Sequence, residues 1–71
     1  MIQVGYTQKP VSEGTFATDV IHGTFTTREE ADASLAALRV AKEGDDTISE
    51  FFFAQLHDGV STKTGFVDPI F

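Results

Sequence analysis

The sequence predicts a small α+β domain in which two strands, one helix and two further strands follow one another. Three observations carry this prediction. Apolar and polar residues alternate near the start of the chain, a helix-capping sequence stands in its middle, and an Asp-Gly pair marks a tight turn near residue 58. We therefore expect one domain over residues 1–71, with a two-layer ββαββ architecture: a four-stranded, mainly antiparallel sheet with one helix packed on one face.

The first strand is expected over residues 1–7, where every second side chain is apolar. A loop with proline, glycine and polar residues follows. The second strand is expected over residues 15–26, which are rich in β-branched and aromatic side chains. Its alternation changes phase, and a β-bulge near residues 20–21 or at Gly23 would reconcile its two halves.

The helix is expected over residues 27–43. It begins with Thr27-Arg-Glu-Glu30, which matches a capping box. Acidic residues occupy its first turns and basic residues its last, and Gly44 suits a left-handed cap after its end. Apolar side chains at helical spacing form one stripe for packing against the sheet: Ala31, Leu35, Leu38 and Ala41.

The third strand is expected over residues 47–57 and contains three consecutive phenylalanines, Phe51 to Phe53. Because side chains alternate across a strand, Phe51 and Phe53 share one face and Phe52 takes the other. One helix covers only one face of a small sheet. We therefore expect Phe51 and Phe53 on the uncovered face, where their burial by a second copy or another protein would contribute about 1.5–3 kcal/mol each.

The fourth strand is expected over residues 60–67, after a tight turn at Asp58-Gly59, where both positions tolerate positive φ. It is polar until Phe66 and so contributes little to a core. We place it at the edge of the sheet, where Lys63 would discourage pairing with another sheet.

The tail, residues 68–71, is apolar at its tip. It is either an arm that packs against another subunit or, as the simpler alternative, a tip that folds back on its own core or frays. The predicted interface with a partner or second copy combines this arm with the last two strands: Phe51, Phe53, Gln55, His57, Phe66, Ile70 and Phe71.

Composition narrows the functional classes. The chain has no cysteine, so oligomerisation is the remaining way to reinforce so small a domain. A formal net charge of −6 argues against binding a nucleic-acid backbone. No apolar run is long enough to cross a bilayer and no targeting segment is recognised, so a soluble, cytoplasmic protein without membrane contact is expected.

No motif predicts a catalytic residue, a metal site or a cofactor. His57-Asp58 together with His22 lacks a third ligand at metal-binding spacing. Lys63-Thr-Gly65 matches one element of the β-lactamase signature, but the accompanying Ser-x-x-Lys is absent. These residues are more simply explained as surface positions.

The leading hypothesis is therefore a small acidic protein-interaction module that forms a homodimer or larger assembly. Within that class, the specific form considered is an inhibitor of phage or accessory type that binds and blocks a larger protein. Small size, acidity and the lack of active-site chemistry suit a blocking role. The alternative is a small-molecule binder or enzyme whose site forms between subunits over the uncovered sheet face, lined by Tyr6, His22, His57 and Lys63.

Overall fold

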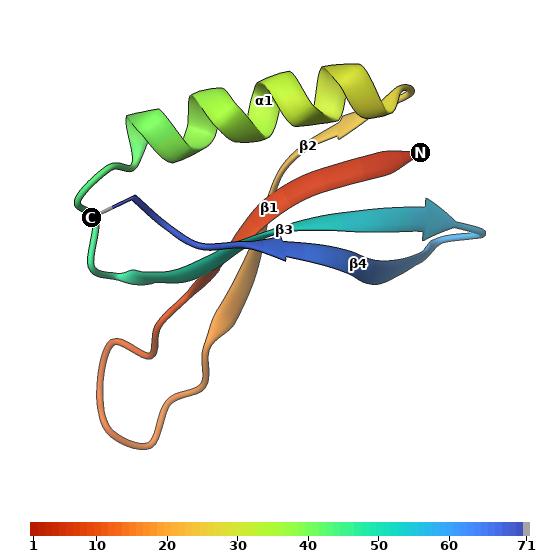
Figure 1. The fold of residues 1–71 in the computed structure, drawn as a ribbon. Coiled ribbons are helices and arrows are strands. Elements are labelled where there is room, and N and C mark those ends of the chain that lie inside the picture. The colour runs from red at the N-terminus through yellow and green to blue at the C-terminus, as the bar shows by residue number, and fades with distance from the viewer. Residues whose placement is uncertain (71) are drawn as a thin grey trace.

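A computed structural model describes residues 1–70 and shows a four-stranded antiparallel sheet with one helix across one face (Figure 1). The sheet order is β2-β1-β3-β4, so β2 and β4 are the edges. The predicted two-layer ββαββ fold is confirmed, and so is the edge position of the fourth strand. The elements in chain order are β1 (Ile2–Gln8), β2 (Thr18–Phe25), α1 (Arg28–Ala41), β3 (Ile48–His57) and β4 (Val60–Val67).

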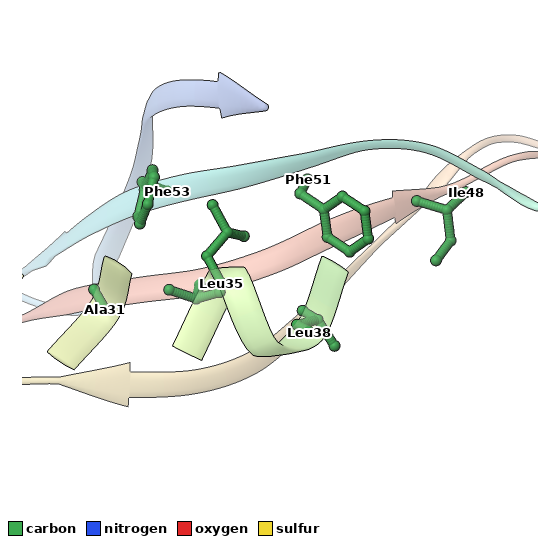
Figure 2. Close-up of a cluster of buried hydrophobic side chains, with 7 residues drawn as sticks. Ala31, Leu35, Leu38, Ile48, Phe51 and Phe53 are labelled. Atoms are coloured by element: carbon green, nitrogen blue, oxygen red, sulfur yellow. The ribbon is translucent and has the colours of Figure 1, made fainter. Parts of the chain in front are cut away.

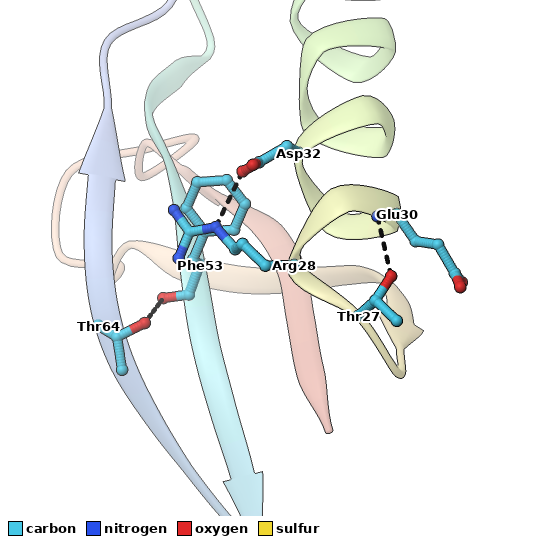
Figure 3. Close-up of polar contacts among 6 residues, drawn as sticks. All are labelled: Thr27, Arg28, Glu30, Asp32, Phe53 and Thr64. Carbon is cyan, nitrogen blue, oxygen red and sulfur yellow. Dashed lines mark hydrogen bonds and ion pairs between the residues drawn. The ribbon is translucent and has the colours of Figure 1, made fainter.

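The helix α1 begins where its capping residue predicts. The Thr27 hydroxyl accepts a hydrogen bond from the Glu30 backbone N–H at 3.2 Å, which satisfies one free donor of the first turn (Figure 3). After the helix, Gly44 takes a φ of +78°, in the left-handed region that favours glycine. The helix packs on β1, β2 and β3, and its stripe Ala31, Leu35 and Leu38 is buried against the sheet, whereas Ala41 is exposed.

A β-bulge in β2 reconciles its two phases of alternation. Val4 pairs with Gly23 and Gly5 pairs with Ile21, so His22 has no partner on β1. The extra residue lies between the two positions that the sequence suggested. As a consequence, Ile21 points to the face opposite α1, whereas strict alternation from Gly23 would place it on the helix-covered face.

A second bulge, in β3, decides which phenylalanines form the core. Thr7 pairs with Glu50, but the next residue of β1 pairs with Ile48, so Ser49 is the extra residue, and its hydroxyl donates to the Thr7 carbonyl at 3.1 Å. This shift puts Ile48 on the same face as Phe51 and Phe53. Those side chains meet the helix stripe in one cluster (Figure 2), whose members are Val4, Ala31, Leu35, Leu38, Ile48, Phe51 and Phe53.

The predicted exposure of Phe51 and Phe53 is therefore wrong, because both are buried beneath α1. Strict alternation along β3 would place Ile48 and Phe52 on one face and Phe51 and Phe53 on the other. The bulge at Ser49 moves Ile48 to the other group, and the helix covers the face with the larger apolar set. Arg28 closes the end of this core, since its guanidinium lies 3.9 Å from the centre of the Phe53 ring (Figure 3).

Turn and tail geometry complete the fold. Asp58 and Gly59 have φ values of 51° and 77°, as expected for the tight turn between β3 and β4.

The tail returns to the end of α1 on its own chain: the Gly44 N–H donates to the Ile70 carbonyl at 2.8 Å, and Arg39 Nε donates to the Asp68 carbonyl at 3.0 Å. Residues 68–70 thus follow the fold-back alternative, while Phe71 lies outside the described residues. Within residues 1–70, no helix has the length and apolar character needed to cross a membrane.

Candidate functional site

The uncovered sheet face carries one apolar row that crosses all four strands. Strand pairing aligns Ile21 with Gly5, Gly5 with Phe52, and Phe52 with Phe66. Directly paired residues place their side chains on the same face, so these four form a line from β2 to β4 on the side opposite α1. We call this line the cross-sheet row.

The centre of the cross-sheet row is sealed by the chain itself. Phe52 is only 1% exposed although no helix covers it. Its ring lies over Gly5, where a side chain would have stood, and the Lys63 ammonium is 4.8 Å from the ring centre. Lys63 reaches from β4 to β2, where its Nζ lies 2.8 Å from a carboxylate oxygen of Asp19. The long lysine side chain therefore acts as a strap across Phe52.

The strap holds an ionised carboxylate. The hydrogen bond from Lys63 holds the pKa of Asp19 below its usual value, and the Thr7 hydroxyl, which donates to the other Asp19 oxygen at 2.9 Å, acts in the same direction. Among the strand residues of this face, the charged side chains are Asp19, Glu50 and Lys63. The face is thus close to electrically neutral, in contrast to the chain as a whole, which carries −6.

The two ends of the cross-sheet row remain open to solvent. Phe66 on β4 is 59% exposed and Ile21 on β2 is 45% exposed. Large apolar side chains at matched positions on one face form a candidate contact surface.

The β1–β2 loop presents a second apolar feature. It projects from the body of the domain (Figure 1) and carries Val11 and Phe16, which are 93% and 89% exposed. Between them, Ser12 and Thr15 close a turn: the Thr15 N–H donates to the Ser12 carbonyl at 3.2 Å, and the Thr15 hydroxyl donates to the same oxygen at 2.6 Å. Gly14 supplies the positive φ of +87° that a type II turn requires at its third residue.

The base of this loop is anchored to the start of β3. The Lys9 N–H donates to the Thr47 carbonyl at 2.7 Å, and the Thr47 N–H and hydroxyl both bond the Asp45 carboxylate, which holds its pKa below the usual value. A depression of about 340 Å³ lies beside the anchor, lined by Lys9, Pro10, Val11, Asp46 and Thr47. The loop is therefore ordered, exposes Val11 and Phe16, and has acidic residues near its base.

A larger depression, of about 440 Å³, lies at the β3–β4 hairpin and is lined by Gln55, His57, Asp58, Val60, Thr62 and Thr64. Gln55 pairs with Ile2 and Thr62, which places it on the face that α1 covers farther along the sheet. His57 and Asp58 approach to 3.2 Å there, but both side chains are highly exposed. Solvated groups of this kind have little of the environment that tunes catalytic residues.

The predicted interface residues do not share one surface. Phe51 and Phe53 are in the core, whereas Phe66 remains exposed on the uncovered face. Gln55 and His57 lie on the opposite face, in the hairpin depression, and Ile70 is half-buried in the tail. Of this set, the structure places Phe66 alone, among residues 1–70, on the surface where the interface was predicted.

The residues of the small-molecule alternative are also dispersed. Tyr6 lies under the helix layer, with its ring centre 6.1 Å from that of Phe51. His22 is the bulged residue of edge strand β2, His57 is at the hairpin depression, and Lys63 straps the uncovered face. A single copy does not bring these four together. Within the described chain, no three His, Asp or Glu side chains cluster as ligands of a metal ion.

Sequence reasoning missed Val11 and Phe16 as candidate binding residues. Val11 was part of the predicted loop, and Phe16 was assigned to the second strand, which begins only at Thr18. The available signal was the pair itself: two large apolar residues flanking Ser-Glu-Gly-Thr, a sequence suited to a tight turn.

Comparison of the chain with protein-family models, with curated proteins and with solved structures gave no match.

Proposed function

We propose that this protein is a small interaction module that binds a larger protein through the β1–β2 loop, with Val11 and Phe16 as its anchors. The observation that carries the proposal is the almost complete exposure of these two side chains on an ordered, projecting loop. Large apolar side chains gain little in solvent, and aromatic anchors dominate the energetics of many interfaces.

Burial of both anchors supplies enough free energy to matter. Transfer of a valine and a phenylalanine side chain from water contributes about 1.5–3 kcal/mol each before the costs of association. The turn between Ser12 and Thr15 lowers those costs, because its hydrogen bonds fix the four residues that separate Val11 from Phe16 before binding. The loop therefore offers two apolar side chains for burial and is preorganised for binding.

Charge specifies the chemistry of the partner. The chain carries −6, and Asp46 lines the depression beside Val11. We propose a partner with an apolar cleft bordered by basic side chains, towards which the acidic module is steered. More specifically, we propose that the module is an inhibitor of the phage or accessory type, which occupies that cleft and blocks it. Added salt is then expected to slow association.

The test compares the wild-type protein with a Val11→Ser/Phe16→Ser variant, both immobilised. Proteins that bind the immobilised wild type and not the immobilised variant are identified and purified. Their binding to each form is then titrated by calorimetry. Phe16→Ser is expected to weaken binding at least about tenfold, as an interface anchor does. The matched control is Val40→Ser, which removes an exposed apolar side chain from α1, away from the loop, and is expected to bind as the wild type does.

The proposal is overturned if the purified partner binds the double variant as tightly as the wild type, or if no protein distinguishes the two. Circular dichroism of each variant establishes that the fold is retained. If a partner is found, an assay of its own activity decides the inhibitor form: occupancy of its cleft is expected to abolish binding of its normal ligand.

A further inference from the structure

We infer that two copies of the chain associate through their uncovered sheet faces, with a two-fold axis parallel to the strands. The cross-sheet row of one copy then lies on that of the other, with Ile21 against Phe66 and Phe66 against Ile21. This contact is independent of the loop proposed above to bind a larger protein. It leaves that loop outside the interface.

The strand order makes the row self-complementary. Ile21 lies on edge β2 and Phe66 on edge β4, at the two ends of one line of paired residues. A two-fold rotation about an axis parallel to the strands exchanges the two edges, so β2 of one copy faces β4 of its partner. Each exposed side chain therefore meets the other type, as an isologous interface requires.

Charge favours this face over the helix side for contact with a second copy. The acidic side chains Glu29, Glu30 and Asp32 are exposed on α1, on the far side of the sheet. When the uncovered faces meet, the two helices lie on opposite outer surfaces, where these charges are farthest apart. On the meeting faces, the Lys63 and Asp19 charges neutralise one another within each copy, which leaves one acidic side chain, Glu50, on each face.

The available area predicts a weak, reversible dimer. Four strands at a spacing of about 4.8 Å, over about seven residues of about 3.3 Å rise, give a face of about 440 Å². Two such faces bury at most about 900 Å², which is below the roughly 1,200 Å² of standard specific interfaces and in the range of weak, transient contacts. Because the strap already buries Phe52, the monomer folds without its partner, and association adds only the outer residues of the row.

The first experiment measures mass by sedimentation equilibrium over a dilution series from about 1 mM to a few micromolar, the range expected of so small an interface. The wild type is expected to pass from dimer to monomer on dilution. Phe66→Ser and Ile21→Ser are each expected to weaken dimerisation at least about tenfold, because each removes apolar contact twice in a two-fold interface. The matched control is Val60→Ser, which alters a similarly exposed side chain on β4 that lies in the hairpin depression of the opposite face.

A second experiment tests the orientation. The chain has no cysteine, so single cysteines introduced as Ile21→Cys and Phe66→Cys are unique sites. With a short bismaleimide reagent, a mixture of the two variants is expected to cross-link between positions 21 and 66. Predominant 21–21 and 66–66 products would overturn the proposed axis.

The inference is also overturned by a wild-type monomer at 1 mM, or by a dimer that Phe66→Ser leaves intact. Equal weakening by Val60→Ser would likewise contradict it. Failure of this test leaves the loop proposal untouched, since the loop test changes Val11 and Phe16 and the present test changes residues of the cross-sheet row.

Discussion

Replacement of Gly5 by alanine is expected to destabilise the fold by about half of its free energy of unfolding. A Cβ placed on Gly5 would overlap the carbonyl oxygen of Val20 and would lie 2.9 Å from Cζ of Phe52. The first contact is with the backbone of the bulged strand β2, and the second is with a ring held beneath Lys63. Neither neighbour is the free end of a flexible side chain.

The magnitude follows from what must move. Overpacking of a tightly filled site costs about 1–3 kcal/mol. Displacement of Val20 also weakens a hydrogen bond of the β1–β2 ladder, which adds about 1 kcal/mol. We expect a total of about 3 kcal/mol, whereas a domain of 71 residues has about 4–11 kcal/mol of stability. The corresponding fall in Tm is about 12–24 °C.

Urea denaturation followed by circular dichroism measures this change, and Gly65→Ala is the matched control. Gly65 also lies opposite a phenylalanine in the sheet, but an added Cβ would meet the Phe53 ring at 3.8 Å, an ordinary contact. This variant is expected to be neutral or to gain up to about 1 kcal/mol, since alanine is less costly than glycine inside a strand. Free energies of unfolding for the two variants that agree within about 1 kcal/mol, the spread of ordinary surface changes, would refute the reasoning.

The remaining predictions concern the strap. Lys63→Met retains the methylenes over Phe52 and is expected to cost less than about 1 kcal/mol, because the ion pair is partly exposed; Lys63→Ala uncovers the ring and is expected to cost about 1 kcal/mol more. Equal urea midpoints for these two variants would contradict the covering role. Because the folded-state pKa of Asp19 is lowered, its stabilising contribution is present above the ordinary aspartate pKa of about 3.9 and is lost as pH falls through the lower folded value. The pKa of Asp45 is lowered as well, so its contribution to stability is also lost as pH falls. The free energy of unfolding is therefore expected to decline below about pH 4. In denaturation curves recorded against pH, Asp19→Asn is expected to make part of that decline less steep. A decline as steep in this variant as in the wild type would contradict the role of Asp19.

Local signals in the sequence predicted the elements of the fold well, because each had its own chemistry. The Thr27 cap, the positive φ at Asp58-Gly59 and the bulge near His22 all depend on residues within a few positions of one another. Non-local consequences were harder to predict. One extra residue at Ser49 changes which face holds Ile48, and this reversed the expected exposure of Phe51 and Phe53.

The candidate sites show the same limit. The strap joins β4 to β2, two strands that are never adjacent in the sheet, so no spacing in the sequence indicates that Lys63 covers Phe52. Val11 and Phe16 were visible as apolar residues, but their exposure depends on where the second strand begins. Of the predicted interface residues, Phe66 lies on the uncovered face because it pairs with Phe52, and the sequence alone does not indicate this register.

The central position of β1 has a consequence for how the chain folds during synthesis. It lies between β2 and β3, and its pairing with β3 joins Ile2 to Gln55, two residues far apart in the sequence. Loop closure of this length is slow compared with formation of the two local hairpins. The β1–β2 hairpin must therefore wait, with Val4 unburied, until β3 has left the ribosome. The seam between β1 and β3 is the last part of the sheet that we expect to close, and chaperones have access to both hairpins until it does.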